Sequence, residues 1–329
     1  MQRSHLPWVI VLAGGEGTRM CPFTEFCFGV ARPKQYCQFF GSRSMLGETV
    51  ARALELTDES HVITVIGHGH RRFLNDMIPG RVLDQPKSRG TAAGVFWPLS
   101  YVLADDPDAT VLILPSDHFV YPKGKALTQV RRACDLAVGH VDRIIILGAI
   151  PDAPETDYGW IRPLPDSGSG AAPLEVLSFH EKPAQIEAFE CYREGCLWNT
   201  MMIAVAARTL WRLGREYLPE VAGRLEALRY QLADRKGDSD PSLYQRTLNA
   251  VYEELPARDF SHDFLARAAR ESLVMPLEGI FWSDWGRPER LSQSLRKARS
   301  DFPNWVQSQE FRHLEHLSYL WTSQRPSGE

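Results

Sequence analysis

Apolar residues in the first half of the chain form short continuous runs that alternate with longer segments of helical content. The runs, rich in Val, Ile and Leu, predict buried strands at residues 8–12, 61–67, 81–85, 111–114 and 143–148. The segments between them predict helices at residues 45–56, 91–104 and 126–138, with a kink or break at Pro98. Buried strands separated by helices predict a parallel sheet that is covered on both faces.

The second half of the chain changes character. Shorter strands are expected at residues 160–162, 175–179, 202–205 and 273–275, and helices at residues 208–217, 220–233, 243–254 and 288–300. Residues 166–173 and 235–241 are polar or rich in small residues, which predicts loops. We therefore expect an α/β domain over residues 1–287, followed by a helical C-terminal tail over residues 288–329. Ligands of such sheets bind at the carboxyl ends of the strands.

Composition narrows the class of protein. The 329 residues are 44% hydrophobic and 24% charged, an ordinary globular balance, and the formal net charge of −4 gives no support to a nucleic-acid surface. The apolar run at residues 8–13 is too short for a signal peptide, and no stretch approaches the ~20 apolar residues that cross a bilayer. We therefore expect a cytoplasmic protein with neither a membrane nor a nucleic-acid partner.

The six cysteines contain no Cys-x-x-Cys pair; they are Cys21, Cys27, Cys37, Cys134, Cys191 and Cys196. A zinc site built from the first three is an alternative, but their spacing fits no common ligand pattern. Reduced, partly buried thiols are the favoured interpretation.

A glycine-rich turn follows the first predicted strand and reads Gly14-Gly15-Glu16-Gly17-Thr18-Arg19. Glycines after a buried strand let backbone N–H groups approach phosphate closely. The dinucleotide fingerprint fails here because Met20 follows in place of a third glycine, and a Walker loop fails because Gly-Lys-Ser/Thr is absent. An ordinary strand-to-loop turn explains the glycines about equally well, but Arg19 favours a phosphate ligand.

Several further motifs follow in order along the chain. They are Arg32-Pro33-Lys34-Gln35, Pro115-Ser116-Asp117-His118, Tyr158-Gly159, Glu181-Lys182-Pro183, Trp198-Asn199 and Trp282-Ser283-Asp284-Trp285-Gly286. Together with the glycine turn, this series resembles the sugar-1-phosphate nucleotidyltransferases over roughly residues 9–299. The Gln after Lys34 makes it most similar to the mannose-1-phosphate guanylyltransferases, which are also called GDP-mannose pyrophosphorylases.

The resemblance implies a Rossmann-like fold of the nucleotide-diphospho-sugar transferase type, with a mixed, mostly parallel sheet. It implies Arg19 and Lys34 as catalytic residues and Asp117 and Asp284 as ligands of Mg²⁺. It implies a nucleotide-binding set of Ala13, Gly14, Gly15, Gly17, Thr18, Gln85 and Arg89. It implies a sugar-phosphate-binding set of Tyr158, Gly159, Glu181, Lys182 and Asn199. The implied substrates are GTP and mannose 1-phosphate, and a homodimer is one assembly that it allows.

Physical chemistry agrees with these roles. Nucleotidyl transfer is an in-line attack by one phosphate on another, so the protein must neutralise charge and align the two anions. Arg19 offers a planar fork for the triphosphate, while Lys34 and Lys182 offer point charges. Two carboxylates that follow separate strands, completed by phosphate oxygens and water, suit Mg²⁺. No general base is needed because the attacking phosphate is already ionised.

Simpler interpretations remain open for single residues. Asp117 could cap a turn, Glu181 and Lys182 could form a solvated ion pair, and Asn199 could be buried with backbone partners. The tryptophans beside the motifs could stack on sugars, but core packing is favoured for most of them. At the level of the whole protein, the alternatives are a transferase for another hexose 1-phosphate and a non-catalytic nucleotide-sugar-binding homologue. An NAD-dependent oxidoreductase is excluded by Met20.

The chain departs from the family pattern at three places. Thr200-Met201-Met202 stands where Ser-Gly-Met usually follows the Trp-Asn pair, and Asp284-Trp285-Gly286-Arg287-Pro288 replaces Asp-Val-Gly-Ser-Trp. Residues 26–30 are inserted where a shorter polar link is typical. The charged catalytic residues are retained, whereas residues that shape the sugar pocket are altered, so mannose specificity rests on less than the reaction class does.

Overall fold

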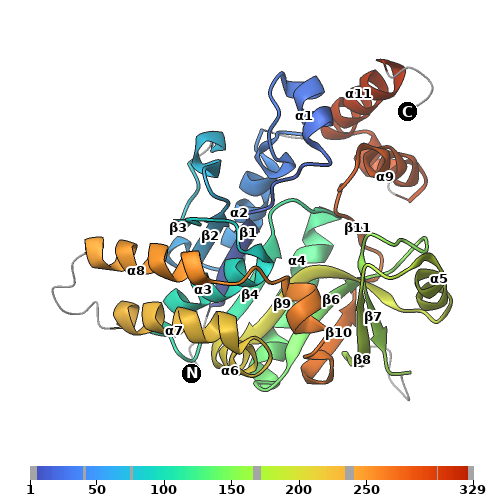
Figure 1. Ribbon diagram of the computed structural model, residues 1–329. Helices are drawn as coiled ribbons and strands as arrows, with labels where there is room; N and C mark the ends of the chain where they lie inside the picture. The colour runs from blue at the N-terminus through green and yellow to red at the C-terminus, as the bar shows by residue number, and fades with distance from the viewer. Residues whose placement is uncertain are drawn as a thin grey trace.

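The computed structural model describes residues 6–39, 42–74, 77–165, 172–233, 241–301 and 303–324. Its centre is a nine-stranded sheet in the order β3-β2-β1-β4-β9-β6-β10-β8-β7 (Figure 1). The strands are β1 (Trp8–Ala13), β2 (Val62–Ile66), β3 (Arg81–Asp84), β4 (Thr110–Pro115), β6 (Ile144–Ala149), β7 (Gly159–Pro163), β8 (Leu174–Glu181), β9 (Leu197–Ala206) and β10 (Ser272–Pro276). A second, two-stranded sheet pairs β5 (Phe119–Tyr121) with β11 (Phe281–Ser283).

The large sheet is mixed but mostly parallel. Strands β3, β2, β1 and β4 are parallel neighbours, and β10 is parallel to β6. Strand β9 is antiparallel to β4, β6 and β7, and β8 is antiparallel to β10 and β7, so only these two strands run against the rest. The predicted fold class is confirmed, and the carboxyl ends of β1 to β4 lie along one edge of the sheet.

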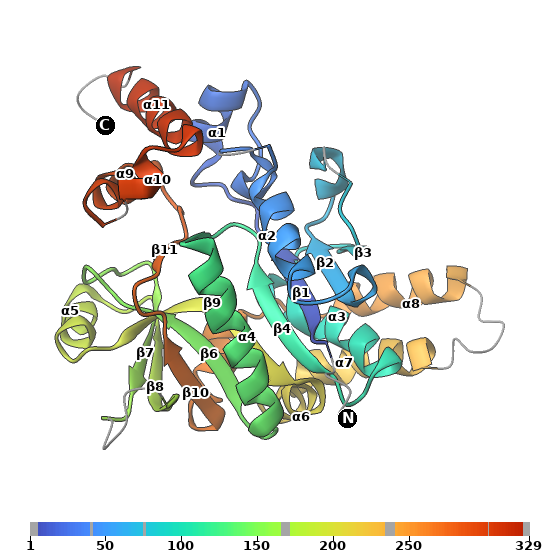
Figure 2. The same cartoon turned by 180° about the vertical axis from the view of Figure 1, so that it is seen from behind.

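Helices cover both faces of this sheet, as Figures 1 and 2 show from opposite sides. They are α1 (Cys21–Phe28), α2 (Met45–Leu54), α3 (Gly90–Asp105), α4 (Lys123–Gly139), α5 (Gln185–Arg193), α6 (Ala207–Tyr217), α7 (Pro219–Ala233), α8 (Pro241–Glu254), α9 (Pro288–Asp301), α10 (Pro303–Val306) and α11 (Gln309–Gln324). Successive side chains of β1 point to opposite faces of the sheet. Trp8 and Ile10 pack with α3, α6 and α7 on one face, and Val9 and Val11 pack with α2 and α4 on the other.

A third apolar cluster lies above the edge of the sheet. It joins α1 to β5, β11 and the C-terminal helices α9 and α11, and its members include Phe23, Cys37, Phe39, Met45, Phe119, Trp285 and Phe311. The boundary between residues 287 and 288 therefore falls inside a shared hydrophobic cluster, and the two-part division of the chain stays a prediction.

Several local expectations need correction. Helix α3 is not broken at Pro98, because the helix is buried along most of its length and tertiary packing offsets the one lost hydrogen bond. The sequence pattern also missed α1, α5, β5 and β11, which are too short or too weakly periodic to stand out. Residues 166–171 and 234–240, which make up most of the two predicted loops, lie outside the described residues.

Candidate active site at the carboxyl edge of the sheet

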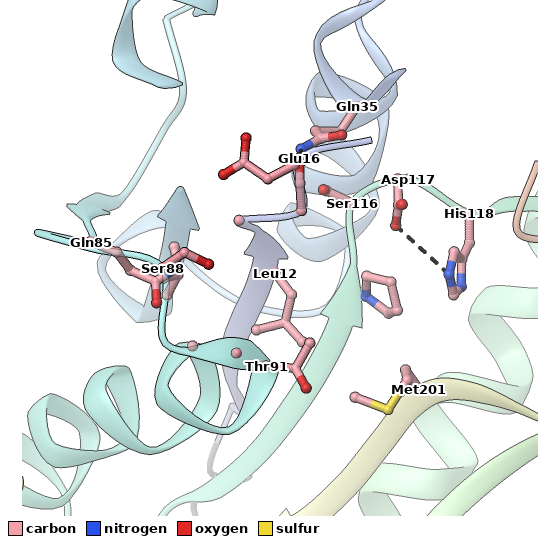
Figure 3. Close-up of a pocket in the computed structure, with 16 residues that line it drawn as sticks. Leu12, Glu16, Gln35, Gln85, Ser88, Thr91, Ser116, Asp117, His118 and Met201 are labelled. Atoms are coloured by element: carbon pink, nitrogen blue, oxygen red, sulfur yellow. Dashed lines mark hydrogen bonds and ion pairs between the residues drawn. The ribbon is translucent and has the colours of Figure 1, made fainter. Parts of the chain in front are cut away.

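A cavity of about 310 Å³ opens at the carboxyl ends of β1 and β4 (Figure 3). The glycine turn after β1 forms one wall, the start of α3 forms another, and Met201 of β9 forms the floor. Polar side chains that line it include Gln85, Ser116 and Asp117. The cavity occupies the position in an α/β sheet where nucleotides are generally bound.

The glycine turn is held from behind by the segment that carries Lys34. Gln35 Nε2 donates to the carbonyl oxygens of Ala13 and Gly15 at 3.2 and 2.7 Å, and the Tyr36 hydroxyl donates to Ala13 at 2.8 Å. Gly17 has a φ of +62°, which favours glycine. The Pro-Lys-Gln motif therefore shapes the turn as well as supplying a charge.

The amide end of Gln85 lies close against Gly14. A Cβ atom at Gly14 would lie 2.7 Å from Gln85 Nε2. Gln85 is buried, and its Oε1 and the Oγ of Ser116 have no hydrogen-bond partner within the described part of the chain. Because unpaired buried polar atoms are costly, both atoms are suited to bonding a ligand in the cavity.

Arg89, expected in the nucleotide-binding set, is turned away from the cavity. Its Nε and Nη2 donate to the carbonyl oxygens of Tyr252 and Glu253 at 2.7 and 2.6 Å, near the carboxyl end of α8. Its neighbours Ser88 and Gly90 line the cavity instead. No local pattern indicated that a helix end would compete for this guanidinium.

Lys34 lies between the two aspartates assigned to the metal. Its side chain is 6% exposed, its Nζ is 3.2 Å from Oδ2 of Asp117, and it also donates to the backbone oxygen of Asp284. His118 follows Asp117 with its Nε2 3.7 Å from Oδ1 of that carboxylate, and burial lowers the pKa of His118. One buried ammonium group thus links two acidic residues that are far apart in the sequence.

Asp284 is the most strongly bonded carboxylate of the site. Its Oδ1 accepts from the Tyr158 hydroxyl and from the backbone N–H of Gly286, both at 2.9 Å, and from Arg290 at 3.0 Å. Burial opposes its ionisation, but the nearby charges of Lys34 and Arg290 outweigh burial and lower the pKa of Asp284 to about 2. Asp284 is therefore a fixed anion at neutral pH.

Arg290 is a site residue that the sequence motifs did not reveal. It comes from helix α9, its side chain is 7% exposed, and it donates to both oxygens of Asp284, to Glu155 at 3.0 Å and to Asp157 at 2.8 Å. Its guanidinium also lies 4.3 Å from the ring centroid of Tyr158. The C-terminal helix thus contributes a buried cation to the acidic cluster.

The predicted sugar-phosphate residues lie on the strands next to this cluster. Lys182 Nζ is 3.3 Å from Oε1 of Glu181, and the Lys182 backbone N–H donates to the Tyr158 carbonyl at 3.1 Å, with Lys182 at φ +48°. A Cβ atom at Gly159 would lie 2.5 Å from Glu181 Oε2. Burial raises the pKa of Glu181, and Lys182 counteracts the shift. The backbone at Lys182 is fixed, but its side chain is 57% exposed while that of Glu181 is 13% exposed, so the lysine end of the pair is solvated.

Asn199 and Met201 lie at a bulge in β9. Gly148 pairs with Asn199 and Leu147 with Met202, which leaves two residues of β9 without partners in β6. Asn199 Oδ1 accepts from the Met201 N–H at 3.0 Å, and its Nδ2 donates to Ser261 Oγ at 3.2 Å. The Asn199 amide is therefore satisfied within the protein, as the simpler interpretation allowed.

Met201 adopts a left-handed backbone conformation at the position where the family pattern has glycine. Its φ is +56°, and its side chain faces the cavity (Figure 3). Ser261 Oγ lies 3.2 Å from its sulfur. A conformation that favours glycine is thus kept although a long side chain has replaced it.

The four tryptophans beside the motifs are packed in the interior. Trp160, Trp198, Trp282 and Trp285 are each at most 5% exposed, and none of them lines the cavity. Trp160 and Trp285 are fully buried in the core, as expected for most of the four, whereas Trp198 and Trp282 also line a second cavity beside Arg290.

The six cysteines form no disulfide, and four of them are buried while Cys21 and Cys27 are half-buried.

The fold and the site define an α/β protein with a glycine-rich turn after β1 and an acidic cluster at the same edge of the sheet. The chain belongs to the nucleotidyl transferase family, whose model matches residues 8–300.

Three similar proteins are each less than 30% identical to the chain. It is 28% identical to a xanthan biosynthesis protein XanB of Xanthomonas campestris over 84% of its own length and 57% of the relative's. It is 27% identical, with the same coverage, to a mannose-1-phosphate guanylyltransferase of Escherichia coli. It matches a crystal structure described as mannose-1-phosphate geranyltransferase from Thermus thermophilus, with a TM-score of 0.72 and 26% identity over 88% of this chain and 79% of that one. The chain spans about half the length of the curated relatives it matches.

Proposed function

We propose that the protein transfers a GMP group from GTP to mannose 1-phosphate, giving a nucleotide-sugar and pyrophosphate. The observation that carries this proposal is the position of Lys34, whose ammonium group joins Asp117 to Asp284 beside the glycine turn. A cation placed between two acidic residues at a phosphate-binding turn suits a reaction between two anions. The mannose-1-phosphate guanylyltransferases among the relatives support the choice of substrates.

In this proposal each of three basic residues binds a different phosphate group of the two substrates. Arg19, which is half exposed at the end of the glycine turn, can reach the triphosphate. Lys34 is buried and fixed, so it suits the α-phosphate, where the attacking oxygen and the leaving oxygen are in line. Lys182, which directly follows β8, binds the phosphate of the sugar in this proposal. Since the attacking phosphate is an anion, no side chain has to remove a proton.

Mg²⁺ fits the residues present. Asp117 and Asp284 offer hard carboxylate oxygens near Lys34, whose ammonium group contacts Asp117 Oδ2 and the backbone oxygen of Asp284. Both carboxylate oxygens of Asp284 also accept from Arg290. Within the described ranges no group of three or more His, Cys, Asp or Glu side chains could hold a metal ion. We propose that Mg²⁺ is held by two carboxylates, with phosphate and water completing its coordination. When bound, the ion would neutralise charge on the triphosphate.

The sugar end of the site matches the family pattern less closely. Glu181 is a half-buried acceptor that packs against Gly159, whereas Asn199 already has two partners within the protein. We propose that Glu181 and Lys182 bind the hexose phosphate and that Met201 borders it. The same residues could also bind a different hexose 1-phosphate. An activity assay with several sugars distinguishes between the two substrates.

Outside the active site, the proposal is a cytoplasmic enzyme without a nucleic-acid or membrane partner, and with a homodimer as a candidate assembly. No helix in the described part of the chain is long and apolar enough to span a membrane. The net charge of −4 likewise does not favour a nucleic-acid partner.

The test is pyrophosphate release measured with Mg²⁺ across a grid of nucleoside triphosphates and hexose 1-phosphates. We expect the highest kcat/KM for GTP with mannose 1-phosphate. A higher value for another hexose would replace the sugar in the proposal. Nucleotide-sugar binding without release from any pair would instead favour a non-catalytic binding protein.

A further inference from the structure

Asp157 contacts three arginines at once. Its Oδ2 lies 3.5 Å from Arg19 Nη1, 2.7 Å from Arg287 Nη2 and 2.8 Å from Arg290 Nη2. Arg290 has two further carboxylate partners, but Asp157 is the only carboxylate that Arg19 and Arg287 contact among the described residues. A single negative charge therefore serves these two exposed cations, whereas the buried Arg290 is also paired with Glu155 and Asp284.

The three arginines differ in how much of each side chain is exposed to solvent. Arg290 is 7% exposed, whereas Arg19 and Arg287 are 49% and 51% exposed. An exposed ion pair contributes little to stability, so Arg19 and Arg287 can exchange Asp157 for a ligand at little cost. The buried Arg290 cannot, because removing it from its partners would leave charges unpaired in the interior. Two of the arginines are thus available to an incoming anion.

The positions of these two arginines point to phosphate. Both guanidinium groups contact the same oxygen of Asp157, which limits the distance between their nearest nitrogens to about 6 Å. A Cβ atom at Gly286 would lie 3.2 Å from Arg19 Nη2, so the turn that carries Asp284 and Arg287 directly borders Arg19. A diphosphate carries several anionic oxygens within such a span, and guanidinium forks bind them with paired hydrogen bonds.

We propose that Arg287 binds the pyrophosphate leaving group together with Arg19, and that Asp157 holds both arginines when no phosphate is bound. The inference rests on the proposed transfer reaction. In that step an oxygen of the sugar phosphate forms a bond to the α-phosphorus, and the bond from that phosphorus to the bridging oxygen breaks. The electron pair leaves with pyrophosphate, where the two guanidinium groups meet the growing charge. Arginine at this position replaces a serine of the family pattern.

The test compares Arg287→Ala with Arg212→Ala, by titrating inorganic pyrophosphate in a calorimeter in the presence of MgCl₂. Arg212 is a matched control because it is 54% exposed and pairs with Glu216 on α6. We expect Arg287→Ala to weaken pyrophosphate binding about tenfold or more, Arg287→Lys to weaken it less, and Arg212→Ala to leave it unchanged.

Asp157→Asn adds a readout that a purely structural role of Arg287 would not move. Releasing the two arginines from their carboxylate should tighten pyrophosphate binding, provided that thermal unfolding shows the variant to be folded. Unchanged pyrophosphate binding in Arg287→Ala would overturn the inference, and so would a loss confined to mannose 1-phosphate. Absence of turnover in the wild-type protein would instead overturn the proposed reaction, so the two failures are distinguishable.

Discussion

Phe119 and Trp285 stack on each other, with ring centroids 4.7 Å apart and planes inclined by 9°. Phe119 comes two residues after Asp117, and Trp285 comes directly after Asp284. Strand β5, which begins at Phe119, pairs with β11, which ends two residues before Trp285, and Ser283 lies opposite Phe119. The stack and the small sheet together hold the two aspartates at opposite sides of Lys34, so an apolar contact sets the geometry of a charged site.

Replacing Trp285 should therefore damage both stability and activity. Trp285 is fully buried, its Nε1 donates to Ser294 Oγ at 3.1 Å, and its φ of +43° shows that packing imposes its backbone conformation. Trp285→Ala should lower the free energy of unfolding by about 3–5 kcal/mol, as expected for a large cavity. Urea unfolding measures this loss.

Trp285→Phe is the milder variant, and Trp97→Phe is its control. Trp97 is also buried, and its Nε1 donates to Tyr244 within the core cluster of the opposite face. Both variants should lose stability, but only Trp285→Phe should lower kcat. Equal kcat in the two variants would show that the stack does not position the aspartates.

Turnover should require a divalent cation and both aspartates. Asp117→Asn and Asp284→Asn should each remove several kcal/mol of transition-state stabilisation, which corresponds to roughly a hundredfold or greater loss of kcat. Asp152→Asn is the control, because Asp152 is exposed and pairs with Lys297. Full activity in excess chelator would exclude the metal site.

Lys34 should act on the chemical step. It is buried and fixed by two partners, so its charge is already in place when charge shifts during transfer. Lys34→Ala should lower kcat more than it raises KM, and Arg19→Ala should do the same. Lys123→Ala, which removes an exposed lysine paired with Glu48, should change neither. An unchanged kcat with weaker GTP binding in Lys34→Ala would contradict this role.

Met201 should reduce the discrimination between hexoses. A side chain in the left-handed conformation costs about 1 kcal/mol or more, and that of Met201 lies where a glycine would leave room beside the cavity. Met201→Gly should raise the ratio of kcat/KM for mannose 1-phosphate over glucose 1-phosphate. Met201→Ala separates bulk from backbone strain, since it removes most of the side chain and keeps the Cβ atom. An equal ratio in all three proteins would show that Met201 does not face the sugar.

The hydrophobic pattern by itself determined the class of fold and most of the elements. Alternating strands and helices needed no tertiary information, because burial on both faces of a sheet leaves a direct mark on the composition of the strands. Motif order along the chain likewise predicted which residues gather at the carboxyl edge, and Gly14, Lys34, Asp117 and Asp284 do lie there.

Tertiary structure alone decided which charges meet. Arg290 of helix α9 donates a hydrogen bond to Asp284, and Arg89 donates to two carbonyl oxygens of α8. Neither contact follows from a local sequence pattern. Only the folded chain shows that Asn199 is already paired and that residue 201 sits at φ +56°. The physical reason is that hydrophobic periodicity is local, whereas ion pairs and backbone strain depend on which distant segments the core brings into contact.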